Sequence, residues 1–372
     1  MKNSKKTIIS WEKPSVQLAL LAVIMTLGTF LFAAAAYIAT KNHFPSSWLE
    51  IWNRWDTVHY LKIAREGYST EGSKIPIVFF PLYPILINFA AFFTHHHLFS
   101  SLLISNAAYV GVVIYFYRLA RMDYPEEISL RTVLYLSVFP SAYFLHAGYT
   151  ESLFILFTLG CFYHARRNEW AVCVLFGVLA TATRITGFCL AIAILIEYFT
   201  QRNWQWKKID KKIFLLFLIP LGVLSYLWIN YYYFQSPFAF LEISKAQWGK
   251  TIYFPWKGLV HAIESLQWRS PSELVTVSIT ELIFALGSLL LCLWALLRLR
   301  ISYGFFAITS WLVITSTSYW LSIPRYSLSI FPIFIALAVL VRNRMLHTLL
   351  VMLSGMLYGF FLLRFVTGQW AF

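Results

Sequence analysis

Residues 18–39 read LALLAVIMTLGTFLFAAAAYIA, a run of 22 residues without a charged side chain. A helix needs about 20 apolar residues to cross the hydrocarbon core of a bilayer. Similar runs, each bounded by charged residues, recur along the 372-residue chain. Since lipid offers no partner to backbone amides and no alternating barrel pattern is present, these runs predict transmembrane helices. We expect an all-α, polytopic transmembrane bundle that forms a single domain over residues 1–372.

The composition supports a membrane protein. Hydrophobic residues make up 59% of the chain and charged residues 12%, whereas a soluble domain carries about 25% charged residues. The formal net charge of +14 suggests nucleic-acid binding, but the basic residues form short clusters between apolar runs. The positive-inside rule and attraction to anionic lipids explain such clusters. We therefore expect membrane lipids as partners and no nucleic acid.

The basic clusters also orient the helices. Lysines before the first apolar run place the N-terminus in the cytoplasm and residues 41–78 outside; these are Lys2, Lys5, Lys6 and Lys13. No small-residue cleavage site follows, so we expect a retained first helix rather than a removed signal peptide. Later basic clusters are expected in the cytoplasm: Arg166, Arg167, Arg202, Lys207, Lys208, Lys211, Lys212, Arg298, Arg300, Arg342 and Arg344. No Asn-x-Ser/Thr sequon occurs, which favours a prokaryotic plasma membrane over a eukaryotic secretory one.

The number of crossings depends on residues 79–165. Twelve apolar segments can be counted along the chain, but a cytoplasmic N-terminus and an external C-terminus require an odd number. We expect 132–165 to cross once, broken around Pro140 to Thr150. That arrangement predicts about eleven crossings.

Two long outer segments, 41–78 and 234–275, are too aromatic to be ordinary solvated loops. In the first, apolar residues recur at helical spacing and polar residues take the opposite side, which predicts an amphipathic helix lying in the membrane interface. The apolar set is Trp48, Ile51, Trp52 and Trp55, and the polar set is Asn53, Arg54, Asp56 and His59.

Asp56 is the leading candidate for acid–base chemistry. The chain has 16 acidic residues, and Asp56 is the only aspartate on the outer side. It follows Trp55, and His59 lies three residues on, hence on the same helix face. A carboxylate partly shielded from water is a stronger base, and a general base contributes about 10²–10⁴-fold to a rate. On residue type alone, a loop aspartate that caps a helix or pairs with Arg54 is the more common interpretation.

Six sequence motifs, which follow one another along the chain in the order found in a known family, favour Asp56 as a catalytic base over an ordinary loop aspartate. Trp55-Asp56, Tyr60, Gly67-Tyr68 and Phe79-Phe80-Pro81-Leu82-Tyr83-Pro84 resemble the first-loop signature of the PIG-V family. These are mannosyltransferases and their bacterial relatives within the GT-C membrane glycosyltransferases. The further matches are Phe139-Pro140-Ser141, Tyr149-Thr150-Glu151-Ser152, Thr183-Arg184, Ala246-Gln247-Trp248-Gly249 and Pro324-Arg325-Tyr326. The resemblance covers residues 50 to 340.

The resemblance implies an inverting glycosyltransferase with a GT-C fold. Its donor would be a sugar, most often mannose, on a polyprenyl monophosphate, and its acceptor a hydroxyl of a lipid or glycan on the outer face of the membrane. Asp56 would act as general base. A monophosphate can be held by arginine and lysine alone, so no metal and no other cofactor is expected.

Arg325 and Arg184 lie at predicted outer hairpins and would hold the leaving phosphate, with Lys245 as a third candidate. The alternative for each arginine is a snorkelling side chain that caps helix carbonyls. The residues expected to bind substrate are Arg54, His59, Tyr149, Glu151, Gln247, Trp248 and Tyr326. Glu151 could instead be a carboxylate favoured by a helix N-terminus.

Two other functions compete with the enzyme. A transporter or flippase of a lipid-linked or anionic substrate should show internal repeats and broken helices with charges at mid-membrane. Here the candidate residues converge on the outer edge, which favours chemistry. The third possibility is a membrane scaffold subunit without catalysis.

Overall fold

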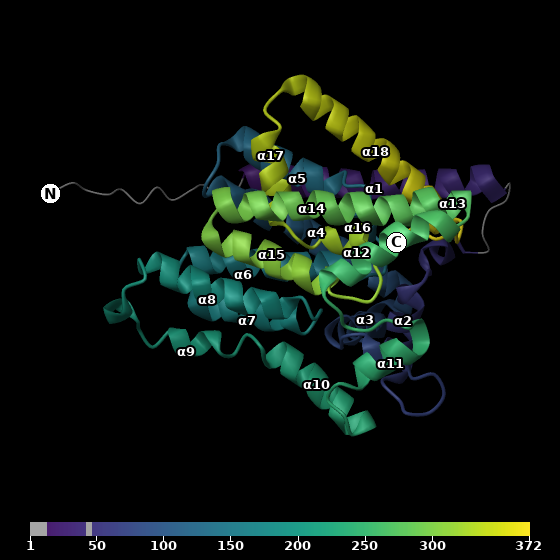
Figure 1. The fold of residues 1–372 in the computed structure, drawn as a ribbon, viewed down its shortest axis with the longest axis horizontal. Coiled ribbons are helices and arrows are strands. Elements are labelled where there is room, and N and C mark those ends of the chain that lie inside the picture. Colours follow the sequence, from purple (N-terminus) through teal and green to yellow (C-terminus); the bar gives the residue numbers. More distant parts are fainter. Residues whose placement is uncertain (1–12, 42–46) are drawn as a thin grey trace.

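The computed structural model describes residues 13–41 and 47–372, and it is built of helices. Within these ranges the only β-type pairing is an isolated bridge between Ile252 and Thr317. The long helices lie alongside one another in a bundle (Figure 1), which confirms the all-α fold. The N-terminal lysines Lys2, Lys5 and Lys6 lie outside the described residues.

The chain forms 23 helical elements in the described ranges. In order they are α1 (Lys13–Lys41), η1 (Trp48–Trp52), α2 (Asp56–Glu66), η2 (Ile75–Val78), α3 (Leu82–Thr94), α4 (His97–Arg121), α5 (Glu126–Ser137), η3 (Ala142–Leu145), α6 (Glu151–Arg166), α7 (Trp170–Thr181), α8 (Gly187–Gln201), η4 (Trp206–Lys208), α9 (Ile213–Leu216), α10 (Leu221–Phe234), α11 (Ala239–Trp248), α12 (Pro255–Trp268), α13 (Pro271–Glu273), η5 (Leu274–Ile279), α14 (Thr280–Arg298), α15 (Ile301–Thr315), α16 (Ile323–Ser327), α17 (Pro332–Leu340) and α18 (Arg344–Val366).

Five helical segments of the described chain are long and apolar enough to cross a membrane. They are Ser15–Lys41, His97–Arg121, Ile213–Phe234, Pro271–Arg298 and Arg344–Val366. Shorter apolar helices, among them α7, α8 and α15, pack between or beside them. The chain is therefore an integral membrane protein, because these apolar surfaces need lipid around them.

Ion pairs mark the two ends of the bundle. At one end, which we call the site end, Arg325 pairs with Asp56 and Glu151. At the other end, which we call the basic end, Asp123 after α4 pairs with Arg166 at the end of α6. Four of the expected cytoplasmic arginines form ion pairs in the described chain: Arg166 with Asp123, Arg167 with Glu169, Arg202 with Asp210 and Arg300 with Glu197.

The passes made by residues 123–166 differ from the prediction. The Ser105 hydroxyl near the start of α4 donates to the carbonyl of Tyr149 at 3.1 Å, while the ends of α4 and α6 meet at Asp123 and Arg166, 2.7 Å apart. Hence α4 and α6 both run from the site end to the basic end, and α5 with η3 runs back between them. The prediction that 132–165 crosses once is wrong. The break around Pro140 to Thr150 exists, but it separates two passes.

The helix α3 is also short. Its 13 residues make a helix about 20 Å long, below the roughly 30 Å of a hydrocarbon core. Helices α5 and α7 have 12 residues each, so length alone does not identify a segment that fails to cross. Side chains on one face are exposed, among them Phe89, Phe92 and Phe93. The sequence could not separate α3 from a full span because both are equally apolar. The number of about eleven crossings stays a prediction.

The first outer loop is also broken where one amphipathic helix was expected. The helix η1 ends at Trp52 and α2 begins at Asp56, and between them Trp55 adopts a positive φ of 49°. Trp52 is fully buried, with its ring 4.8 Å from that of Phe30 and 6.0 Å from that of Phe365. Tertiary packing of Trp52 thus ends the helical periodicity, and it places Asp56 at the first turn of a new helix.

Close backbone packing fixes the turn between α7 and α8, which carries Arg184. A Cβ atom on Gly222 of α10 would lie only 2.3 Å from the backbone nitrogen of Ala182. Glycine therefore lets α10 approach this turn more closely than any other residue would, as small residues do between membrane helices.

We expect Gly222→Ala to destabilise the protein by about 1–3 kcal/mol, because the added methyl group meets backbone atoms that cannot move aside. Thermal unfolding in detergent measures this effect. The matched control is Gly287→Ala on α14, where a Cβ would meet no atom within 4 Å and where alanine should be neutral or mildly stabilising. Equal melting temperatures for the two variants would show that the packing at Gly222 is not tight.

Candidate active site

Four charged side chains meet at the site end, and Arg325 of α16 lies at their centre. Its Nη1 donates to Asp56 Oδ2 at 2.7 Å, and its Nε donates to Glu151 Oε1 at 2.6 Å. Arg184 Nη1 donates to the same Glu151 oxygen at 2.6 Å and reaches Thr150 Oγ1 at 3.3 Å. We call Asp56, Glu151, Arg184 and Arg325 the charged cluster. The structure therefore brings together four of the residues selected from the sequence.

The members of the charged cluster differ sharply in their access to solvent. The side chain of Glu151 is 0% exposed and that of Arg325 is 6% exposed, whereas that of Asp56 is 29% exposed. Charges buried to this degree persist only when they are paired. The cluster holds two positive and two negative groups, so its formal charges cancel. Asp56 is the carboxylate of the cluster that an incoming molecule can reach.

Aromatic rings surround the Arg325 guanidinium. Its Cζ lies 4.5 Å from the ring centre of Tyr149, 5.1 Å from that of Phe144 and 5.6 Å from that of Tyr326. The Arg184 Cζ lies 5.5 Å from the Tyr326 ring. Such rings stabilise a cation and exclude water from the cluster. Tyr149 and Tyr326, expected to bind substrate, thus line the site.

Several polar groups of the cluster have unused hydrogen-bonding capacity. Among the described residues, no hydrogen bond is made by Nη2 of Arg325 or by Nε and Nη2 of Arg184. The second oxygen of Glu151 is buried without a partner, and Oδ1 of Asp56 accepts no hydrogen bond from the described chain. The site therefore offers donors for an anion beside acceptors for hydroxyl groups.

Glu281 holds Arg325 in place, and sequence reasoning did not select it. This buried carboxylate of α14 accepts hydrogen bonds from the backbone N–H groups of Ser322 at 2.6 Å and Ile323 at 2.8 Å. These groups open α16, the one-turn helix that carries Arg325, and Ser322 has a positive φ of 73°. A lone glutamate inside the apolar run 276–297 was the signal that could have identified it, because such residues are costly in a membrane segment.

The backbone on either side of Asp56 is fixed by the segment before α6. The Thr57 hydroxyl donates to the carbonyl of Gly148 at 3.3 Å, and the Tyr149 hydroxyl donates to the carbonyl of Arg54 at 3.1 Å. A side chain at Gly148 would bring its Cβ to 2.7 Å from the Ser101 hydroxyl. Asp56 and Glu151 are therefore positioned as one unit, although 95 residues separate them in the sequence.

Arg54 and His59 flank Asp56 without pairing with it. Arg54 Nη2 donates to the carbonyl of Val366 at 3.1 Å, so the pairing of Asp56 with Arg54 is not observed. The His59 ring stacks on Phe79, with centroids 5.1 Å apart. Burial lowers the pKa of His59 below 6.5, although Asp56 opposes this effect. His59 is therefore neutral at pH 7 and available as a hydrogen-bonding group.

The structure does not bring Lys245, Gln247 and Trp248 into contact with the charged cluster. They are exposed on α11. The carbonyl of Trp248 accepts a hydrogen bond from Tyr319 at 2.8 Å, and the carbonyl of Lys245 accepts one from the backbone N–H of Gly249 at 2.9 Å. The nearer cation is Lys250, whose Nζ lies 5.7 Å from the ring centre of Tyr326. A left-handed Gly249 ends α11 and turns the chain back, which sequence spacing did not indicate.

Among the described residues, no three His, Cys, Asp or Glu side chains gather as a metal site. The carboxylates of the cluster are engaged by arginines, which leaves phosphate binding to the guanidinium groups. Metal independence remains a prediction that a chelator can test.

We expect Glu281→Gln to lower the free energy of unfolding by about 1–3 kcal/mol, because an amide can accept from only one of the two N–H groups and leaves the other unsatisfied. Thermal unfolding in detergent checks this, with the exposed Glu273→Gln as the control. If both variants unfold at the wild-type temperature, Glu281 does not hold α16.

Comparisons with known proteins identify the family and the fold. A family model for mannosyltransferases of the PIG-V type matches residues 30–257. ArnT from Cupriavidus metallidurans, solved with undecaprenyl phosphate, is similar at a TM-score of 0.52 and 14% identity over 88% of this chain and 61% of that chain. The Archaeoglobus fulgidus oligosaccharyltransferase in its apo form is similar at 0.50 and 10% identity, over 97% and 57%.

At these identities the two likenesses show the fold alone, which is that of GT-C membrane enzymes. The chain spans about three fifths of the length of either enzyme. A search of curated proteins found no match.

Proposed function

The chain belongs to the PIG-V family of mannosyltransferases and is a glycosyltransferase, and we propose that it transfers mannose from a polyprenyl-phosphate donor to a hydroxyl of a lipid or glycan acceptor. Asp56 acts as the general base in this proposal. The ArnT structure contains undecaprenyl phosphate, a polyprenyl monophosphate, and this supports the donor class.

One observation carries the proposal: Asp56 is the reachable carboxylate of a cluster that otherwise consists of buried charges. Its Oδ2 is held by Arg325 at 2.7 Å, which orients the carboxylate and leaves Oδ1 for an acceptor hydroxyl. Glu151 is fully buried and pairs with both arginines. It therefore suits the positioning of these two cations, whereas Asp56 suits the role of base. A base must lie within hydrogen-bond reach of the proton that it removes.

The transfer is a single displacement. The acceptor oxygen attacks the anomeric carbon, its proton passes to Asp56, and the bond from that carbon to the phosphate oxygen breaks with inversion. The bonding electrons leave with the polyprenyl phosphate. The unused N–H groups of Arg184 and Arg325 can bind this growing negative charge, as preorganised donors do in other transfer reactions.

Donor binding and proton transfer are linked through Arg325. A donor phosphate at Nη2 would compete with Asp56 and Glu151 for the charge of one guanidinium. Binding the donor would therefore loosen the hold of Arg325 on Asp56 as the acceptor arrives. We also propose that the arginines hold the phosphate without a metal ion.

The distribution of basic residues supports an orientation of the protein in the membrane. The basic end carries the arginine and lysine clusters expected in the cytoplasm, so the charged cluster would face outward, across a prokaryotic plasma membrane. There a polyprenyl donor could reach the site from the surrounding lipid.

We expect Asp56→Asn to reduce transfer by about 10²–10⁴-fold, because the amide cannot accept the proton. The assay supplies purified protein with radiolabelled polyprenyl-phosphate mannose and a lipid acceptor. Glu50→Gln is the matched control, since the Glu50 side chain is exposed in the same loop and accepts a hydrogen bond from the Asn53 side chain. Wild-type rates in Asp56→Asn would remove Asp56 from its proposed role.

Arg184 is the better probe of phosphate binding, because Arg325→Ala would leave two carboxylates short of a partner and cost about 3–5 kcal/mol. We expect Arg184→Gln to raise the donor KM by about tenfold or more, in line with a lost charged hydrogen bond of roughly 1.5–3 kcal/mol. Arg344→Gln, exposed at the start of α18 and outside the cluster, is the control. A donor KM that stays at the wild-type value would argue that Arg184 only supports Glu151.

A further inference from the structure

Asp56 lies in a tight turn formed by residues 54–57. The backbone N–H of Thr57 donates to the carbonyl of Arg54 at 3.1 Å, and this hydrogen bond closes the turn. Trp55, at the second position, has a φ of 49° and a ψ of −116°. These are the angles that the second position of a type II′ turn requires, and glycine is strongly preferred there. Asp56 takes the third position, so the direction of its side chain depends on how Trp55 is held.

The sequence has a large aromatic residue where glycine would fit without strain. A residue with a Cβ atom is disfavoured at these angles, and it keeps them only when surrounding contacts fix the conformation. Conformations of this kind cluster at active sites. The flanks of the turn are bonded to the segment before α6, by Tyr149 to the carbonyl of Arg54 and by Thr57 to the carbonyl of Gly148. Neither bond involves Trp55, so its conformation needs another contact.

That contact is made by Trp370, which follows α18. The centres of the Trp55 and Trp370 rings are 5.2 Å apart and their planes are inclined by 69°, an edge-to-face arrangement that stabilises aromatic pairs. No other ring contact of Trp55 is formed within the described residues, and its side chain is 39% exposed. The Trp370 ring is therefore the aromatic group that braces Trp55.

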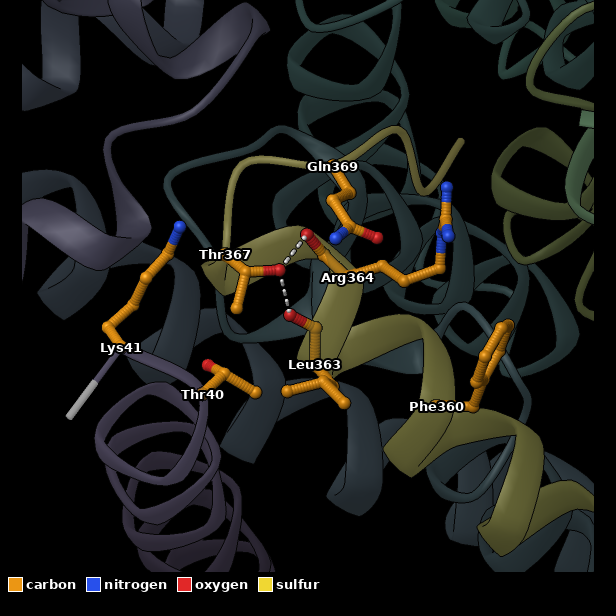
Figure 2. A pocket seen from close by; sticks show the side chains of 7 residues that line it. All are labelled: Thr40, Lys41, Phe360, Leu363, Arg364, Thr367 and Gln369. Atoms are coloured by element: carbon orange, nitrogen blue, oxygen red, sulfur yellow. Dashed lines mark hydrogen bonds between the residues drawn. The ribbon is translucent and has the colours of Figure 1, made fainter. Parts of the chain in front are cut away.

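The turn that ends α18 fixes the position of Trp370. The Thr367 hydroxyl donates to the carbonyls of Leu363 and Arg364 (Figure 2, dashed lines). The backbone N–H of Gln369 donates to the carbonyl of Arg364 at 2.8 Å, and Arg364 Nε donates to the carbonyl of Trp370 at 2.9 Å. The chain thus folds back over the end of α18, and Trp370 comes to lie against the first outer loop.

The residues on either side of Trp370 are also anchored at the site end. Arg54 Nη2 donates to the carbonyl of Val366 at 3.1 Å. Ala371 and Phe372 are buried, and the Tyr143 hydroxyl donates to the carbonyl of Ala371. The ring that braces Trp55 therefore comes from a segment that is itself packed into the core.

We propose that Trp370 is a positioning residue for Asp56. Its ring holds Trp55 in a conformation that otherwise favours glycine, and this fixes the direction of the Asp56 carboxylate. The role rests on the proposed function, since it requires Asp56 to be the general base. A catalytic group misplaced by about 1 Å loses up to roughly 10²-fold in rate. Tryptophan at position 55 supplies what glycine lacks, a ring that a neighbour can hold.

The first test measures kcat, donor KM and melting temperature of the purified chain with Trp370→Ala. We expect kcat to fall by about tenfold or more, while the donor KM stays near the wild-type value because the arginines of the charged cluster bind the phosphate. Trp370→Phe should restore most of kcat, since it keeps a ring and loses only an indole N–H that forms no hydrogen bond to the described chain. Trp206→Ala is the control, because Trp206 is 76% exposed among the basic residues after α8.

Two substitutions of Trp55 test the backbone role without changing Trp370. Alanine loses the ring but keeps the Cβ atom, whereas glycine adopts the angles of the turn without strain. Trp55→Gly should therefore have a higher kcat than Trp55→Ala. In the Trp55→Gly background, Trp370→Ala should cause no further loss of kcat, because no ring remains to be held. Such non-additivity is the signature of two residues that act together.

A wild-type kcat in Trp370→Ala would overturn the proposal, even if the melting temperature falls, because Trp370 would then have a structural role alone. A kcat in Trp55→Ala equal to or above that of Trp55→Gly would also overturn it, and this comparison decides if Trp370→Ala does not fold. The catalytic proposal fails separately. Full activity in Asp56→Asn would remove the base, whereas an inactive Asp56→Asn beside a fully active Trp370→Ala would remove only the positioning role.

Discussion

The structure depends on neutralising one buried guanidinium. Arg325 is almost inaccessible, and its two carboxylate partners come from the first outer loop and from the start of α6. Removing either partner would leave a buried charge uncompensated, at a cost of about 3–5 kcal/mol. This requirement holds α2, α6 and α16 together, and through Arg184 it extends to the turn between α7 and α8. The same pairing orients Asp56, so the stability of the site end and the geometry for chemistry have one origin.

The family match and the charged cluster cover different parts of the chain. Asp56, Glu151 and Arg184 lie inside the matched residues 30–257, whereas Arg325 and Glu281 lie beyond them. The ion pairs show that the C-terminal part of the chain completes the cluster. A site defined from the matched region alone would contain two carboxylates and one arginine, and it would lack the cation that contacts both carboxylates.

Much of the fold and part of the site could be predicted from the sequence. Apolar runs predicted the helices, and the positions of Arg184 and Arg325 between such runs predicted that both lie near Asp56. Hydropathy could not show how short α3 is, because a 13-residue helix and one half of a longer span have the same composition. Nor could spacing show that Trp52 packs into the core, that Glu281 caps α16, or that Gly249 turns Lys250 rather than Lys245 toward Tyr326. Each of these depends on contacts between residues far apart in the chain.

The two acids of the charged cluster lie at very different distances along the sequence from their arginine partners, so these partners are synthesised at different times. Arg184 follows Glu151 by 33 residues, whereas Arg325 follows Asp56 by 269. At about 5–20 residues per second, a ribosome supplies Arg184 within roughly 2–7 seconds of Glu151, but Arg325 only about 13–54 seconds after Asp56. Glu151, which ends fully buried, thus acquires a positive partner early in membrane insertion. Asp56, which stays partly exposed, can wait in water, so the order of synthesis matches the order in which the two acids need a counter-charge.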